Sequence, residues 1–154
     1  MKIVTNTCKL SILAAVFGVA ILSTACSSTG MKSADAAPAM AAALTLSGAQ
    51  EVPANPSMAS GKSTIVIAAD KSVSGKVSFS GMNATVAHIH EAPPGTNGGV
   101  IVPLTKGADD TFSVPAGAKL TDAQYASYMA GNLYVNVHSA TYPGGEIRAQ
   151  LSPK

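Results

Sequence analysis

The chain between Leu44 and Leu151 is divided into short apolar runs, and this division limits the possible folds more than any other feature. Gly, Pro, Asn, Asp and Ser separate the runs, and these residues favour turns. Several runs alternate apolar and polar residues with a period of two, which is typical of half-buried strands. We therefore predict eight strands, in LTLSGAQEV, KSTIVIAAD, KVSFSGM, TVAHIHEA, GVIVPL, TFSVPAG, NLYVNVHSA and GEIRAQL.

One segment, LTDAQYASYMAGN at residues 120–132, has helical character instead. Thr121 or Asp122 is the expected N-cap, and Gly131 is the expected end. The segments ADKSVSGK and SATYPGGE are predicted to connect hairpins. Short strands, tight turns and one short helix together predict an all-β, antiparallel Greek-key sandwich or flattened barrel.

The first 25 residues differ from the rest of the chain. Lys2 and Lys9 are their only charges, an apolar run follows, and small residues precede Cys26, which is typical of a secretory signal peptide. The apolar run is shorter than the roughly 20 residues that span a bilayer. LSTAC followed by SS resembles a bacterial lipoprotein signal in which Cys26 receives the lipid, although Ser23 stands where leucine is usual. The alternative is ordinary cleavage beside an incidental cysteine.

Residues 26–43 are rich in Ala and Ser and lack the bulky side chains that a core requires. They are predicted to form a flexible tether between the lipid and a single domain at residues 44–151. We therefore expect an exported protein that is attached to a membrane of the cell envelope through Cys26 and faces the periplasm or the cell surface.

Composition excludes several classes of function. Cys8 and Cys26 are the only cysteines, so a mature chain with lipid on Cys26 has no thiol for a disulfide, an iron–sulfur cluster or a thiolate metal site. The two positive charges in excess belong to Lys2 and Lys9, which leaves a formally neutral mature chain and no basic run for nucleic acid. Neither a Gly-x-Ser-x-Gly elbow nor a phosphate-binding loop is present.

The three histidines carry the clearest chemical signal. His88 and His90 are two residues apart in a predicted strand, so both side chains project from one face, about 6.5–7 Å apart. Two imidazoles at this spacing can lean onto one metal ion at about 2 Å each. In NLYVNVHSA the apolar residues alternate with Tyr134, Asn136 and His138, so His138 lies on the polar face of its strand.

We therefore expect all three histidines to lie outside the hydrophobic core and to form a shared metal site. The alternative is that these are exposed histidines on polar strand faces, with His138 serving only to cap its hairpin. The sequence alone does not establish that the two strands are neighbours.

The segments AHIHEAPPGTNGGVIVPL and LYVNVHSATYPGGEIRAQL, together with SGAQEVPA near the start, resemble the chordin-type (CHRD) domain over residues 44–151. The glycine that usually follows the histidine pair is displaced here by EAPP. The resemblance implies an immunoglobulin-like or superoxide-dismutase-like Greek-key sandwich. It also extends distantly to copper/zinc superoxide dismutases, and it then implies that His88, His90 and His138 match copper ligands while the zinc half of that site is absent.

Copper is the expected metal, because three neutral imidazoles with an open position suit it and export favours it; zinc is the alternative. Either Glu146 or Arg148 is expected across the hairpin from His138. There Arg148 could attract a small anion, and Glu146 or Asn136 could orient an imidazole. The alternative for Arg148 and Glu146 is a surface ion pair.

Two functions follow. The first is copper sequestration or delivery, or a redox role against superoxide that would make the protein a copper-dependent, dismutase-like enzyme. The second is a binding module for protein or glycan in which the histidines are incidental, because CHRD domains of animals occur in a secreted protein that binds growth factors.

Overall fold

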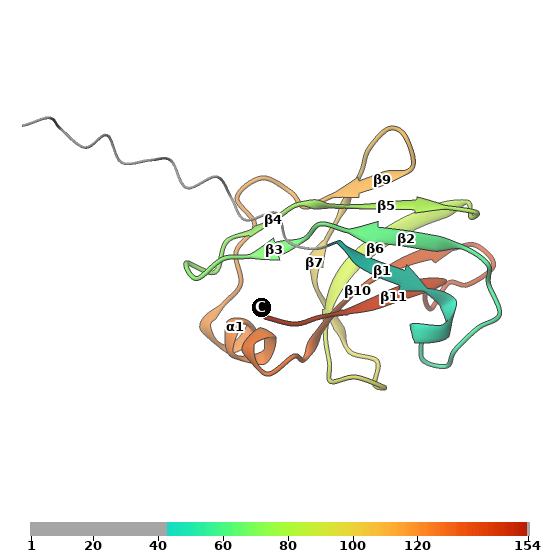
Figure 1. Cartoon of the computed structure of the whole chain (residues 1–154). Coiled ribbons are helices and arrows are strands. Elements are labelled where there is room, and N and C mark those ends of the chain that lie inside the picture. The colour runs from blue at the N-terminus through green and yellow to red at the C-terminus, as the bar shows by residue number, and fades with distance from the viewer. Residues whose placement is uncertain (1–42, 154) are drawn as a thin grey trace, which may run out of the picture. The chain divides into compact units, whose positions relative to one another are not determined.

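The computed structural model describes residues 43–153 (Figure 1). The predicted signal peptide, the predicted lipid site at Cys26 and nearly all of the predicted tether lie outside the described residues. Within residues 43–153, no helix combines the length and the hydropathy that crossing a bilayer requires.

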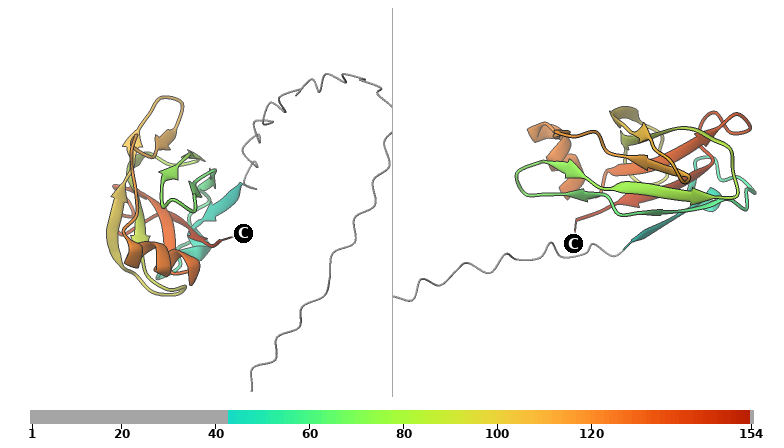
Figure 2. Two further views of the ribbon diagram at one scale, coloured as in Figure 1. Left: turned by 90° about the vertical axis from the view of Figure 1, so that its left-hand side faces the viewer. Right: turned by 90° about the horizontal axis from the view of Figure 1, so that it is seen from above.

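In the part of the chain that the structure describes, nine strands form one antiparallel sheet in the order β7-β6-β10-β11-β1-β2-β5-β9-β8, and a separate two-stranded ladder pairs β3 with β4. The layer that contains β2 and β5 lies over the layer that contains β6, β10 and β11 (Figures 1 and 2). The strands are β1 (Leu44–Ser47), β2 (Ser60–Ser63), β3 (Val66–Ile67), β4 (Val73–Ser74), β5 (Lys76–Ser80), β6 (Ala84–Glu91), β7 (Gly99–Pro103), β8 (Thr105–Lys106), β9 (Thr111–Ser113), β10 (Leu133–Ser139) and β11 (Ile147–Leu151).

The sheet is nearly closed into a barrel, because its two end strands, β7 and β8, are consecutive in the chain. β7 pairs with β6, and β8 pairs with β9. Between them the Leu104 main-chain N–H donates to the Ala87 carbonyl oxygen at 2.9 Å. The predicted all-β antiparallel architecture is confirmed.

The side chains between the layers are those that the alternation assigns to the core. Ala87 and Ile89 of β6 are fully buried, as are Leu133, Val135 and Val137 of β10. Phe79 and Phe112 pack across the opposite end of the sheet with ring centroids 5.5 Å apart. Burial of such side chains contributes about 1.5–3 kcal/mol each, so the pairing of β6 with β10 is held firmly from the core side.

The helix α1 (Asp122–Met129) lies at one end of the barrel (Figure 2). Thr121 is its N-cap and forms a capping box with Gln124, in which each side chain bonds to the other residue's main-chain N–H. Its end agrees with the prediction, since Ala130 is the C-cap and Gly131 follows with a φ of 76°. Tyr125 and Tyr128 pack against the core, whereas the rest of the helix is exposed or half-buried.

Three features of the secondary structure differ from the predictions. The predicted strand LTLSGAQEV ends at Ser47, and Gly48–Gln50 form a short 3-10 helix, η1. The predicted run KSTIVIAAD is divided between β2 and β3, and at the break the Ile65 main-chain N–H donates to the Ser63 hydroxyl instead of to a neighbouring strand. The two-residue strands β4 and β8 were not predicted, since two residues cannot display a period.

Candidate metal site

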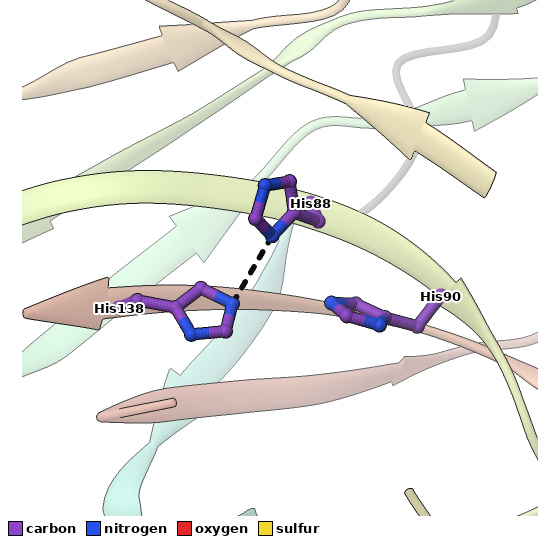
Figure 3. Close-up of side chains that lie close together, drawn as sticks. All are labelled: His88, His90 and His138. Carbon is purple, nitrogen blue, oxygen red and sulfur yellow. Dashed lines mark hydrogen bonds between the residues drawn. The ribbon is translucent and has the colours of Figure 1, made fainter. Parts of the chain in front are cut away.

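The three histidines meet at the centre of the β6–β10 pair. His88 lies directly across from Asn136 in the β6–β10 ladder, and His138 lies across from Val86. This antiparallel register puts His138 diagonally next to His88 on one face. Figure 3 shows a ring nitrogen of each histidine directed into the space between the three rings. The candidate ligand nitrogens all lie within 4.8 Å of one another.

The pair formed by His88 and His138 has the spacing of two ligands on one ion. Nδ1 of His88 is 3.2 Å from Nε2 of His138, the contact drawn as a dashed line in Figure 3. Two nitrogens that each bind one ion at about 2.05 Å, with a tetrahedral angle between them, are about 3.3 Å apart. The rings therefore need almost no movement to share an ion, once the Nδ1 proton that His88 donates to His138 has moved to Nε2 of His88.

Two of the imidazoles are oriented from behind by main-chain carbonyl groups. A carbonyl oxygen can only accept a proton, so Nδ1 of His138 donates to Pro143 at 2.9 Å and Nδ1 of His90 donates to Gly98 at 3.0 Å. Each ring then carries its lone pair on Nε2. A backbone carbonyl that fixes the tautomer in this way is typical of metal-ligating histidine.

Nε2 of His90 is the most informative atom of the site. It is buried, and it has no hydrogen-bond partner among residues 43–153. Leaving a buried acceptor unsatisfied costs about 1–3 kcal/mol, so a fold that keeps such an atom usually supplies it with a water molecule or an ion. Its lone pair is free, as ligation requires.

The site keeps its imidazoles neutral. Burial lowers the pKa of all three histidines, and for His88 the neighbouring His138 and His90 lower the pKa further. The carbonyl groups of Gly98 and Pro143 oppose this effect at His90 and His138 without cancelling it. Neutral imidazole is the form that binds a metal, so a cation displaces few protons here.

All three histidines lie outside the hydrophobic core cluster, as expected, but other segments of the chain cover two of them. His90 and His138 are only 7% and 8% exposed, and only His88 is half-buried. Every residue of β10 is buried, because segments 92–98 and 140–145 cover the polar face that the alternation assigned to solvent. The interpretation as exposed surface histidines is therefore incorrect.

Of the two residues considered for the position across from His138, Arg148 is not the one. It pairs with Asn136 rather than His138, and it is only 2% exposed. Its guanidinium carbon lies 3.4 Å from the centroid of the Tyr134 ring. The guanidinium donates to Thr96, Asn97 and Gln150, so it is enclosed by protein instead of facing an open position.

Glu146 also has other partners. Its carboxylate accepts from the Ser57 hydroxyl at 2.6 Å, and the acceptor for His138 is Pro143 rather than this carboxylate. Among the described residues, neither Glu146 nor Arg148 takes part in an ion pair. The surface ion pair that we considered is therefore wrong, because both side chains are buried with separate partners.

Asn136 lies at the base of the site and is 2% exposed. Its amide nitrogen is 3.5 Å from the Gly144 carbonyl oxygen, while its amide oxygen has no partner within the described range. Glu51 lies beside it, since a Cβ at Gly145 would overlap both side chains. Burial raises the pKa of Glu51 to about 7, although the Arg148 charge acts in the opposite direction.

Sequence reasoning missed Tyr134, Gly98, Pro143 and Glu51. The Tyr134 ring stacks on His90 with centroids 4.8 Å apart and an angle of 4° between planes. The PGGE turn after His138 was a usable signal for Pro143, because a tight turn brings its carbonyl groups back toward the strand end. Glu51 gave no signal, since nothing local connects it with residues far along the chain.

These features define a class of protein: a flattened antiparallel barrel that carries a largely buried cluster of three histidines on one face of its sheet. The CHRD domain family model matches residues 42–151. The chain therefore belongs to the CHRD domain family, as its motifs indicated. A search of curated proteins and a search of solved structures each found no match to the chain.

Proposed function

We propose that this CHRD domain binds one metal ion through His88, His90 and His138, and that the ion is copper. The observation that carries the proposal is the buried, unpartnered Nε2 of His90, which is directed at a pair of imidazole nitrogens already 3.2 Å apart. The carbonyl groups of Gly98 and Pro143 hold the Nδ1 protons of His90 and His138. The Nε2 lone pairs of these two rings are therefore free of protons before any ion binds.

The donor set supports copper over other divalent ions. Imidazole nitrogens bind Cu(II) more tightly than the other first-row divalent metals, and zinc is the main competitor. The described residues contain no cysteine that could favour a thiolate site. His88 is half-buried, so it is the ligand through which an ion enters or leaves.

The proposed role is copper sequestration or delivery at the cell envelope, by a protein that is exported and attached to a membrane through Cys26. A redox role against superoxide is the further possibility if the bound ion exchanges electrons. The enclosed Arg148 guanidinium supports the carrier role, since no free arginine among the described residues lies at the metal position to attract an anion.

The test exploits the fact that the chain has only three histidines. Tag-free protein is titrated with Cu(II), and electron paramagnetic resonance and pulsed electron–nuclear measurements count the coordinated imidazoles. We expect one equivalent of copper with three imidazoles, and one imidazole fewer in each of His88→Ala, His90→Ala and His138→Ala. Asp109→Asn, at an exposed loop carboxylate, is the matched control and should behave as wild type.

A weak copper signal that is the same in wild type and in all four variants would contradict the metal site. The binding module for protein or glycan would then be the remaining function. Competition between zinc and copper identifies the preferred metal. Superoxide consumption by the copper-loaded protein then separates carrier from enzyme.

A further inference from the structure

The carbonyl group that orients His90 belongs to a segment that cannot hold its own position. Residues 93–97 are exposed, and Gly98 is half-buried. The only main-chain hydrogen bond within this segment is a turn from Thr96 to Pro93 at 3.2 Å. Other side chains must therefore fix the place of the Gly98 carbonyl oxygen.

Arg148 provides the largest part of that anchoring. Its guanidinium donates to the Thr96 carbonyl oxygen at 3.0 Å and to the Asn97 side chain at 3.2 Å. Asn97 also donates to the Val52 carbonyl oxygen at 2.6 Å, which ties the segment to a second part of the chain. Since Arg148 is only 2% exposed, its N–H groups have no access to bulk water and depend on these acceptors.

Tyr134 completes the connection between Arg148 and His90. β10 lies between β6 and β11, so His90 and Arg148 approach the Tyr134 ring from opposite sides. The Tyr134 hydroxyl accepts from the Gly98 main-chain N–H at 3.2 Å, while the carbonyl oxygen of the same glycine accepts from His90. Gly98 is thus held at both of its polar atoms.

The fit at this position is close. A Cβ on Gly98 would overlap the Glu91 carbonyl oxygen, so the segment lies directly against the end of β6. A small displacement of the segment therefore lengthens the bond from His90 to Gly98. Without that bond, the Nδ1 proton of His90 loses the acceptor that holds it.

We propose that Arg148 is a positioning residue for the histidine site. It holds residues 96–98 and the Tyr134 ring so that His90 stays in the Nδ1–H tautomer with its Nε2 lone pair facing His88 and His138. The hydrogen bond at one ring nitrogen determines which nitrogen remains free, so this arrangement acts on His90 without touching the ion. The consequence for metal affinity rests on the proposed function, but the tautomer of the metal-free protein does not.

The test measures the tautomer first. Long-range proton–nitrogen correlation spectra of the metal-free protein distinguish Nδ1–H from Nε2–H imidazole. We expect His90 to be Nδ1–H in wild type and a mixture in Arg148→Gln and Arg148→Lys, because lysine keeps the charge but loses the planar fork. Copper affinity should fall about 10- to 100-fold, as for other outer partners of metal ligands.

Asn97→Ala serves as a second variant in case the Arg148 variants do not fold. Asn97 is exposed, and its substitution removes only one acceptor of Arg148. It should shift the tautomer in the same direction, whereas Asn83→Ala, at another exposed asparagine, should not. Retention of pure Nδ1–H in both Asn97→Ala and a folded Arg148 variant would overturn the proposal. A changed tautomer in a protein that binds no copper would instead overturn only the proposed function.

Discussion

Glu51 gives the sharpest quantitative prediction, because it is a carboxyl group that the fold prefers to keep neutral. Its side chain is 6% exposed, and its Oε1 has no hydrogen-bond partner in the described part of the chain. Burial raises its pKa from 4.5 to about 7, even though Arg148 is near enough to lower it. We predict that Glu51→Gln stabilises the protein at alkaline pH and not at acidic pH.

The sign follows from proton linkage. A carboxyl group whose folded pKa is raised favours the folded state when protonated, so its effect is neutral below pH 4.5 and becomes destabilising as the pH rises toward 7. A tenfold change in proton affinity corresponds to about 1.4 kcal/mol, so the ionised carboxylate costs about 3 kcal/mol above pH 7. The amide of glutamine has nearly the same shape and no charge, and it avoids this cost.

The assay is urea unfolding of metal-free wild type and Glu51→Gln at pH 4.5, 6 and 8. The histidines titrate in both proteins, so their contribution cancels in the difference. We expect the difference in unfolding free energy to be near zero at pH 4.5 and to reach about 3 kcal/mol in favour of the variant at pH 8. Asp109→Asn, at an exposed loop carboxylate, should show no such trend. A difference that stays constant from pH 4.5 to 8 would refute the reasoning.

Three further predictions concern the metal, the core and the lipid. Copper at 1,000 times its dissociation constant should stabilise wild type by about 4 kcal/mol in thermal unfolding, and an equal gain in His138→Ala would contradict the site. Ile89→Ala removes a fully buried side chain between the two histidines of β6, and it should cost about 2–5 kcal/mol in urea unfolding. If Cys26 carries the proposed lipid, Cys26→Ser should release the protein from the membrane fraction, and mass spectrometry should find a lipid on wild type alone.

The strands and their inward faces could be predicted from the sequence, because the alternation of apolar and polar residues is a local property of each strand. Ile89, Val135 and Ala149 were assigned to the core from alternation, and all three are buried. Alternation says nothing about what covers the opposite face. The burial of His90 and His138 comes from segments 92–98 and 140–145, which tertiary structure brings over β6 and β10.

The partners of Arg148 and Glu146 show the same limit in another way. Both were assigned to one strand face, which suggested that they pair with each other. Instead Glu146 bonds to Ser57, 89 positions away in the sequence, and Arg148 bonds to Thr96, 52 positions away. Contacts at such separations depend on the nearly closed barrel, and no local pattern encodes them.

The convergence of the histidines depends finally on the register between β6 and β10, and the core enforces that register. Val137 lies across from Ala87 and Val135 across from Ile89, all of them fully buried. A slip of one residue would turn His138 into the core and Val137 out of it, which the hydrophobic burial forbids. A slip of two residues would keep the faces but move His138 about 6.5–7 Å along the strand, which exceeds the 4.8 Å that now contains all three ligand nitrogens. The apolar alternation that specifies the barrel therefore also assembles the site, although none of its residues contributes a ligand.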